Sequence, residues 1–319
     1  MPVPAAVMKQ LTAIPNFKVI KNEPLAGYTR FDIGGPAAVL GDASSAEAGR
    51  AALHALAQNG ERRMIIGGGT NLVVSDGGFD GIVLRYTGAA IEHESTTLRV
   101  EAGAVLQDVV DRSIALGLKG LETMTGIPGS LGGAVYGNAG AYGHSIQELV
   151  TAVHATNGER MQMFSNAECQ FRYRDSVFKQ QKEWLILSAE LRFTPGDTAE
   201  LKKIADGIRS IRDAKYPPTM KCAGSIFKNL MLAELPASVQ AQVPSNIVRE
   251  GKVPSAWFLE QVGAKGLRRG DIQVAEYHAN LIYNDGSGTA ADLVAVIQEL
   301  KSRVRERFGF DIEEEVQYV

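Results

Sequence analysis

The chain has 319 residues, of which 45% are hydrophobic and 22% charged, and its formal net charge is −3 at pH 7. This length exceeds one small hydrophobic core, so we expect two or three domains. The balanced charge gives no overall basic field and argues against nucleic acid as a partner, and no apolar run has the length of a membrane span.

The cysteine and histidine content excludes further classes. Two cysteines, Cys169 and Cys222, are too few for a disulfide framework or a thiolate metal site. The five histidines show no metal-ligand spacing, so we expect no metal. The opening residues MPVPAAVMKQL lack an apolar core of signal-peptide length, and few cysteines suit a reducing compartment. We therefore expect a cytoplasmic protein.

The first part of the chain predicts short elements that end at glycines. Residues 45–59 have helical spacing, and Gly60 follows them. The stretch RRMIIGGG predicts a strand that enters a glycine turn, and further short strands are expected at 71–74, 81–85 and 97–100. A second amphipathic helix is expected at 105–116, closed by Gly117.

The second part predicts strands near 148–154, 160–164 and 184–193, followed by a change of composition. A polar helix begins near Asp197 and stops at Pro217 and Pro218. A final helix is expected over 289–308, and the ending DIEEEVQYV predicts a terminal strand that returns to an earlier domain. The short strands do not alternate regularly with helices, so the pattern indicates an α+β chain with boundaries near 85 and 196.

Two stretches are unusually rich in glycine. GGGTN (67–71) directly follows a predicted strand, and GIPGSLGGAVYGNAGAYG (126–143) contains seven glycines. Successive backbone N–H groups in such turns can form an anion-binding concavity. The pattern matches neither G-x-G-x-x-G nor the P-loop. Tight turns are the alternative, but two amide-rich stretches favour an extended diphosphate ligand.

Several motifs in order along the chain resemble the UDP-N-acetylenolpyruvoylglucosamine reductase family, in its shorter form. They are YTRFDIGGPA (28–37), IIGGGTNLVVSDGGFDGIVL (65–84), GLETMTGIPGSLGGAVYGNAGAYG (120–143), FRYRDSVFK (171–179), KYPPTMKCAGSIFKN (215–229), HANLIYN (278–284) and IEEEV (312–316). The chain departs from the family at Leu230, where proline is common, and at 269–272. The match is poor over 230–253, so substrate contacts there stay unassigned.

The resemblance implies an α+β protein with an FAD-binding fold of the vanillyl-alcohol-oxidase (PCMH-type) class plus a C-terminal α+β substrate domain. The implied domains are FAD-binding subdomain 1 (1–85, joined by a C-terminal strand at 312–319), FAD-binding subdomain 2 (86–196) and a substrate-binding domain (197–311). It also implies non-covalent FAD, NADPH as reductant and a UDP-sugar enolpyruvyl ether as substrate in peptidoglycan precursor synthesis. We expect a monomer.

The resemblance places the cofactor on the two glycine-rich stretches. The implied contacts are Gly67, Gly68, Gly69, Thr70, Asn71, Gly126, Ile127, Pro128, Gly129, Ser130, Gly133, Asn138, Gly140 and Ala141. At Gly133 we expect a positive φ and close approach of the backbone to the cofactor, so a bulky side chain there should prevent binding.

Reduction of an enolpyruvyl group develops negative charge beside a carboxylate, so the site needs a fixed cation and a proton donor. The guanidinium fork of Arg174 suits a carboxylate, although its position alone favours a structural ion pair with Asp175 or another acid. Ser225, taken alone, is a turn or capping residue. The resemblance instead makes Arg174, Ser225 and Glu315 the catalytic residues, with Ser225 as the proton donor to carbon.

The remaining implied contacts belong to the substrate or to NADPH. The resemblance places Lys215 near nicotinamide or the substrate phosphate, Asn229 near the substrate, and His278 near the substrate diphosphate. Lys215 and Lys228 are also close enough in sequence to assist Ser225. If the terminal residues alternate as a strand, Glu313 and Glu315 share one face and Glu314 the other, so only the family pattern selects Glu315.

Two other functions compete with this interpretation. One is an FAD-linked sugar or hydroxy-acid oxidase of the same fold, in which flavin is often tethered through histidine or cysteine. The glycine-rich stretches offer only His144 for such a tether. The other is a non-catalytic nucleotide-binding protein, which would need the glycines but not Arg174, Ser225 and Glu315.

Overall fold

The computed structural model describes residues 3–319, and internal contacts divide the chain into two compact units. Unit 1 comprises the residues up to 23, 37–70 and 79–217, and unit 2 comprises 24–36, 71–78 and 218–319. Two short N-terminal segments thus belong to the unit that holds the C-terminal third of the chain. The three-domain division at 85 and 196 stays a prediction.

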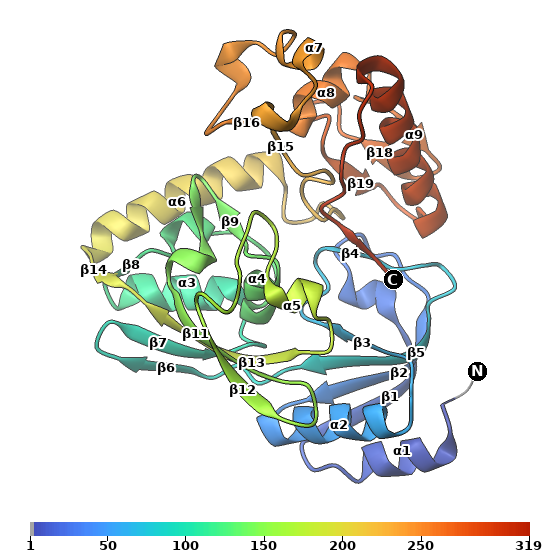
Figure 1. Cartoon of the computed structure of the whole chain (residues 1–319), viewed down its shortest axis with the longest axis vertical. Coiled ribbons are helices and arrows are strands. Elements are labelled where there is room, and N and C mark those ends of the chain that lie inside the picture. The colour runs from blue at the N-terminus through green and yellow to red at the C-terminus, as the bar shows by residue number, and fades with distance from the viewer. Residues whose placement is uncertain (1–2) are drawn as a thin grey trace. The chain divides into compact units, whose positions relative to one another are not determined.

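Unit 1 contains two main sheets and the helices that pack on them (Figure 1). Its helices are α1 (Ala5–Thr12), α2 (Ala46–Gln58), α3 (Leu106–Ala115), α4 (Leu131–Tyr136), α5 (Val177–Gln180) and α6 (Thr198–Lys215). Its strands are β1 (Phe17–Pro24), β2 (Pro36–Ala43), β3 (Arg63–Ile66), β5 (Phe79–Tyr86), β6 (Ile91–Glu94), β7 (Thr97–Glu101), β8 (Leu118–Lys119), β9 (Gly140–Ala141), β10 (His144–Ser145), β11 (Val150–Thr156), β12 (Met161–Ser165), β13 (Leu185–Arg192) and β14 (Thr194–Pro195).

The first sheet of unit 1 has the order β1-β2-β5-β3, and β2 and β3 both run parallel to β5. Parallel strands buried on both faces are nearly continuous apolar runs, as in Ile82–Leu84 of β5. The second sheet is antiparallel, in the order β12-β11-β13-β7-β6. One hydrophobic core joins the buried residues of both sheets and their helices.

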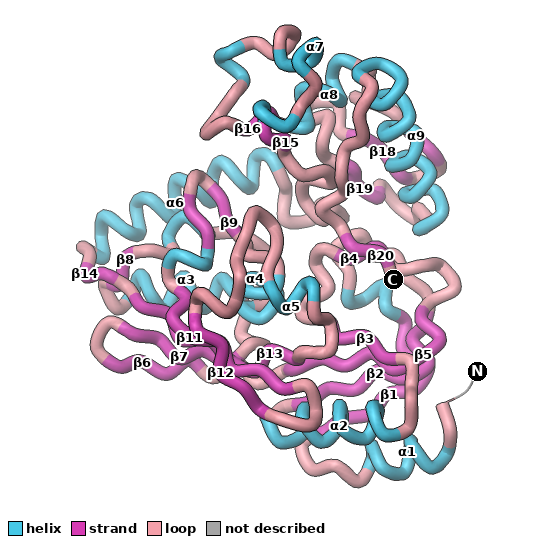
Figure 2. Tube along the Cα trace, viewed as in Figure 1, coloured by secondary structure: helices cyan, strands magenta, loops and turns pink. Residues whose placement is uncertain are grey.

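Unit 2 is built around one long helix and short strands (Figure 2). Its elements are β4 (Leu72–Val73), β15 (Leu230–Met231), α7 (Ala237–Gln240), β16 (Lys252–Val253), α8 (Ser255–Gln261), β17 (Arg268–Arg269), β18 (Ile272–Val274), β19 (Ile282–Asn284), α9 (Ala290–Phe308) and β20 (Gln317–Tyr318). Its core includes Phe31, Ile33 and Val73 from the N-terminal segments together with the buried face of α9.

The three long predicted helices are confirmed as α2, α6 and α9, each with a side-chain cap. Ser45, Asp197 and Thr289 accept a hydrogen bond from the backbone N–H three residues later, which explains why these helices begin there. No helix within residues 3–319 is long and apolar enough to cross a membrane.

Two local predictions need correction. The predicted terminal strand is regular only at β20, because the backbone changes its partner: Glu315 N–H donates to Ile226 and Gln317 N–H donates to Asn71. The glycine-rich stretch 126–143 is not only loop, since α4 forms inside it. Ser130 caps α4 by accepting from Gly133 N–H at 3.3 Å, which stabilises a helix that the glycine content disfavours.

Candidate active site

The GGGT turn begins where β3 ends. Gly67 follows Ile66, the last residue of a parallel strand, and the carboxyl ends of such strands are the usual ligand-binding edge of an open sheet. Gly67 and Gly68 are exposed, whereas Gly69 is buried with φ +66°. The turn therefore presents backbone, not side chains, along this edge.

Unit 1 brings the two glycine-rich stretches into direct contact. A Cβ on Gly67 would lie 3.0 Å from Ser130 Oγ, and one on Gly68 would lie 3.1 Å from Gly129 Cα. Gly129 has φ +116°, and its Cβ would lie 2.9 Å from Thr70 Oγ1. Side chains would force the stretches apart, so glycine is needed here for close backbone approach. The two amide-rich segments are therefore neighbours in unit 1.

The adjacent glycines of α4 have different surroundings. A Cβ on Gly132 would lie 2.9 Å from Ala102 Cβ, so Gly132 allows α4 to pack against its neighbours. Gly133 is exposed, and its Cβ would meet only Ser130 Oγ, at 3.6 Å. Gly133 is also helical and its φ is not positive, so the expected backbone strain at this position is wrong.

Several of the predicted cofactor contacts have hydrogen bonds within the protein. Gly126 N–H donates to Gln107 Oε1 at 2.7 Å. Asn138 is 3% exposed, and its Nδ2 donates to Gln147 Oε1 at 3.0 Å and to Arg172 O at 2.8 Å. These groups hold the shape of the stretch. Ile127 packs on the core, and Gly140–Ala141 forms β9, which pairs with β10.

Arg174 lies in a tight turn that is tied to the end of the glycine-rich stretch. The N–H and carbonyl groups of Arg172 and Asp175 are mutually hydrogen-bonded, and Arg174 within this turn has φ +56°. A left-handed conformation costs a non-glycine residue about 1–2 kcal/mol. Arg174 Nη2 donates to Gly140 O at 3.1 Å, and the buried Ser176 Oγ donates to Tyr136 O at 2.7 Å. The guanidinium is therefore held beside this stretch at a cost in backbone strain.

The Asp175 carboxylate is hydrogen-bonded to Ser176 and Gln180. Its Oδ1 accepts from Ser176 N–H at 2.9 Å, and its Oδ2 accepts from Gln180 Nε2 at 3.0 Å. The Arg174 guanidinium also lies 5.3 Å from the centre of the Tyr173 ring, which is exposed. The planar guanidinium of Arg174 therefore lies beside an exposed aromatic ring of unit 1.

Two buried polar atoms near Gly126 have no hydrogen-bond partner within residues 3–319. They are Thr123 Oγ1, in the 3₁₀ turn Glu122–Met124, and Arg212 Nε. Arg212 packs on the glycine-rich stretch, since a Cβ on Gly126 would lie 3.1 Å from its Nε. Burial lowers the pKa of Arg212 from its usual value. A buried guanidinium Nε–H without an acceptor among the described residues suits an anionic ligand.

Sequence reasoning missed Arg212, although a signal for it existed. The buried face of α6 contains Leu201, Ala205 and Ile208, and helical spacing continues that face to Arg212. A permanently charged residue in line with an apolar face needs a partner. That pattern marks Arg212 as a candidate binding residue.

In unit 2, Ser225 begins a segment held between two others. Ser225 forms a backbone bridge with Leu281, and Ile226 N–H donates to Asn280 O at 3.1 Å. On the other side, Glu315 N–H donates to Ile226 O at 2.7 Å. The motifs AGSIFKN, HANL and EEE, which lie far apart in sequence, are therefore neighbours in unit 2.

The buried Asn280 side chain fixes this arrangement. Its Oδ1 accepts from Phe227 N–H at 2.9 Å, and its Nδ2 donates to Phe227 O at 2.9 Å. One amide thus satisfies both backbone groups of a residue that is 1% exposed. The Ser225 segment is anchored through backbone contacts that do not involve its hydroxyl.

The three terminal acids have different environments. Glu313 accepts from Lys228 Nζ at 2.7 Å, and this pair is solvent-exposed on the Glu313 side. Glu314 pairs with Lys301 Nζ at 2.9 Å and is only 15% exposed. Glu315 is half-buried, and its backbone follows the Ser225 segment. Lysines therefore engage Glu313 and Glu314, and Lys228 is a partner of Glu313.

The other predicted residues are divided between the units. Lys215 ends α6 in unit 1, with its Nζ 5.0 Å from the centre of the Tyr216 ring. In unit 2, Asn229 Oδ1 accepts from Ser255 N–H at 3.4 Å. His278 Nδ1 accepts from Asn280 N–H at 3.3 Å. Across residues 3–319, no group of three His, Cys, Asp or Glu side chains could hold a metal ion.

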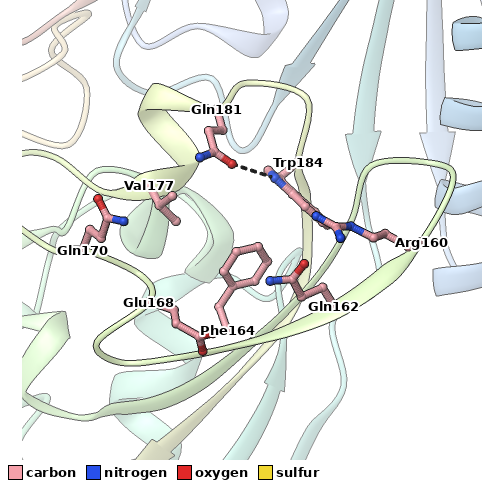
Figure 3. A pocket seen from close by; sticks show the side chains of 8 residues that line it. All are labelled: Arg160, Gln162, Phe164, Glu168, Gln170, Val177, Gln181 and Trp184. Carbon is pink, nitrogen blue, oxygen red and sulfur yellow. Dashed lines mark hydrogen bonds between the residues drawn. The ribbon is translucent and has the colours of Figure 1, made fainter.

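Unit 1 also contains a cavity of about 240 Å³ (Figure 3). It is lined by Arg160, Gln162, Phe164, Glu168, Gln170, Val177, Gln181 and Trp184. The Arg160 guanidinium lies 5.4 Å from the Trp184 ring centre, and Trp184 Nε1 donates to Gln181 Oε1 at 3.2 Å. None of its lining residues is a predicted site residue.

Comparison with known proteins gives a consistent result. Residues 216–319 match the family model described as UDP-N-acetylenolpyruvoylglucosamine reductase, C-terminal domain, and residues 37–159 match the FAD binding domain model. These matches agree with the predicted combination of an FAD-binding fold and a C-terminal α+β domain.

Curated relatives and one solved structure extend the match over the chain. The UDP-N-acetylenolpyruvoylglucosamine reductase of Solibacter usitatus is 56% identical over 310 residues, which are 97% of this chain and 99% of that protein. The Bacillus subtilis protein of the same name is 32% identical, covering 95% and 94%. The crystal structure of the reductase from Thermus caldophilus is 25% identical, with a TM-score of 0.74 over 95% of this chain and 98% of that chain.

Proposed function

The chain belongs to the UDP-N-acetylenolpyruvoylglucosamine reductase family, and from this membership we propose how its residues divide the reaction among them. It is an FAD-dependent oxidoreductase that uses NADPH to reduce UDP-N-acetylglucosamine enolpyruvate to UDP-N-acetylmuramate, in peptidoglycan precursor synthesis. The observation that carries this function is the 56% identity with a reductase over 97% of the chain.

The residues of unit 1 fit a bound FAD. Gly67 and Gly68 let the two glycine-rich stretches approach closely, and Gly133 leaves an exposed backbone surface that a side chain would cover. The buried atoms Thr123 Oγ1 and Arg212 Nε lack partners among the described residues. We assign these groups to the non-covalent cofactor, with Arg212 facing an anionic part of it. Bound FAD supplies hydride transfer from NADPH to the substrate.

Arg174 would bind the substrate carboxylate. As hydride reaches the terminal methylene carbon, negative charge grows on the neighbouring carbon and spreads into that carboxylate. A fixed guanidinium stabilises this charge most where it is greatest, which lowers the barrier. The strained φ of +56° supports this role, because strain of this kind persists where a side chain is needed in one place.

Ser225 would protonate the carbanion-like carbon, and Glu315 would stabilise the developing enolate by donating a proton or hydrogen bond. The support is that these residues come from adjacent backbone segments of unit 2, joined by the bond between Glu315 N–H and Ile226 O. A serine hydroxyl is a weak acid, so it needs neighbouring polar groups such as Glu315 to give up its proton. Lys215, Asn229 and His278 are assigned to NADPH or to the substrate.

We also propose a domain division, an oligomeric state and a cellular location for the protein. Residues 1–85 and 86–196 would form the cofactor-binding part and 197–311 the substrate-binding part, with the terminal strand returning to the first. The protein would act as a cytoplasmic monomer. Sedimentation of the holoenzyme checks the oligomeric state, and a dimer would contradict it.

A spectrum and two half-reactions test the function. The purified protein should be yellow and release FAD on heating, NADPH should bleach it without oxygen, and the enolpyruvyl substrate should restore the colour. A colourless protein would indicate a non-catalytic nucleotide binder. If oxygen reoxidises the reduced flavin but the enolpyruvyl substrate does not, the protein would be an oxidase.

Gly133→Ile should give folded protein with little FAD. Isoleucine is compatible with the helical φ of this exposed position, so the melting temperature should change by only a few degrees. Its branched side chain would cover the backbone surface assigned to the cofactor. The measurement is the ratio of flavin to protein absorbance after gel filtration.

A matched control is Gly207→Ile, at an exposed glycine of α6 with nothing within 4 Å of its Cβ position. That variant should keep its full flavin content. Equal flavin content in both variants would show that Gly133 is not at the cofactor.

A further inference from the structure

Asn71 follows the glycine turn, yet its hydrogen bonds lead to the end of the chain. Asn71 Nδ2 donates to Glu315 O at 2.9 Å, and Asn71 O accepts from Gln317 N–H at 3.0 Å. The next two residues form β4, which pairs in parallel with β20. The side-chain amide and the backbone carbonyl of Asn71 therefore bind the backbone on either side of Val316.

Glu315 lies where the terminal backbone bends and leaves regular pairing. Glu314 forms an isolated bridge with Phe227, and strand geometry resumes only at Gln317. At this bend the two backbone polar groups of Glu315 face opposite partners: its N–H donates to Ile226 O at 2.7 Å, and its carbonyl accepts from Asn71 Nδ2. The Asn71 side chain thus replaces a missing ladder partner.

We propose that Asn71 is a positioning residue for Glu315, and not a ligand of the cofactor. This inference rests on the proposed role of Glu315 at the substrate. The hydrogen bond from Asn71 Nδ2 to Glu315 O holds the Glu315 backbone next to the Ser225 segment. It thereby fixes the position from which the Glu315 side chain extends. Misplacement of a reacting group by about 1 Å can cost about 100-fold in rate.

The test uses the holoenzyme of Asn71→Ala and Asn71→Asp. The alanine removes the donor, and the aspartate keeps the size but places an acceptor against the Glu315 carbonyl. Both variants should retain wild-type FAD content and wild-type bleaching by NADPH. Reoxidation by UDP-N-acetylglucosamine enolpyruvate should slow by about 10- to 100-fold, at least as much in the aspartate variant. The limiting rate, not the half-saturating substrate concentration, should carry the loss.

Asn157→Ala is the control, because Asn157 Oδ1 accepts from two backbone N–H groups in unit 1, between β11 and β12, and lies in no proposed site. It should leave both half-reactions unchanged. Loss of FAD from the Asn71 variants, or reoxidation at the wild-type rate, would overturn the positioning role. A wild-type holoenzyme that the substrate does not reoxidise would instead contradict the proposed function itself.

Discussion

Ser225→Ala should reduce its flavin with NADPH at nearly the wild-type rate and then reoxidise with substrate several orders of magnitude more slowly. Only the second half-reaction needs a proton delivered to carbon. A general acid typically contributes about 10²- to 10⁴-fold, and we expect a larger loss because water should not reach the carbanion in a closed site. Stopped-flow flavin absorbance separates the two halves.

The structure explains why Ser225→Ala should still fold. The Ser225 segment is held by backbone bonds to Asn280 and Glu315, and by the Asn280 side chain on Phe227. Removing one half-buried hydroxyl leaves these bonds and the core in place. FAD content and melting temperature should therefore match the wild type.

Two further variants sharpen this experiment. Ser225→Cys should recover part of the reoxidation rate, because a thiol is a stronger acid of similar size. Ser287→Ala, at an exposed serine of unit 2, should change neither half-reaction. Reoxidation of Ser225→Ala at the normal rate would make the hydroxyl a turn residue, and Glu315 would become the leading candidate for the acid.

Arg174→Lys should lose at least tenfold in turnover, about 1.4 kcal/mol of transition-state stabilisation, with little change in stability. Lysine keeps the charge but loses the bidentate fork. Both residues bear the same cost at φ +56°, so the variant isolates the head group. The hydrogen bond from Arg174 Nη2 to Gly140 O, which lysine would not reproduce, is worth about 1 kcal/mol. Steady-state kinetics and thermal melting measure the two effects.

Arg172→Lys provides the matched control in the same turn. Arg172 is exposed and contributes its backbone to the turn, so this variant should keep both activity and melting temperature. If Arg174→Lys loses stability and turnover in parallel, the structural ion-pair interpretation of Arg174 would be supported instead.

Local signals predicted the long elements of this fold well. The capped, amphipathic helices α2, α6 and α9 follow from side-chain periodicity, and the apolar run at 81–85 follows from burial on both faces of a parallel sheet. The short helix α4 was missed, because glycine content disfavours a helix and its stability comes from the Ser130 cap and from packing of Gly132 on Ala102.

The sequence indicated the types of residue in the candidate site better than the contacts among them. Glycine content indicated that backbone is closely approached at 67–70 and 129–133, but not that these two stretches contact each other. No local pattern indicates that Asn71 bonds to Glu315, because that pairing joins residues far apart in sequence. The division of Glu313, Glu314 and Glu315 among their partners depends equally on distant lysines.

The composition of unit 2 has a consequence for synthesis of the protein in the cell. Phe31, Ile33 and Val73 leave the ribosome early, but the core that buries them is formed mostly by residues after 218. Ser75 N–H finds its acceptor only at Val319. During translation these apolar side chains therefore stay unburied after all residues of unit 1 have been synthesised. Nascent chains stalled before α9 should therefore bind chaperones and be cleaved by proteases at 24–36 and 71–78, while unit 1 resists.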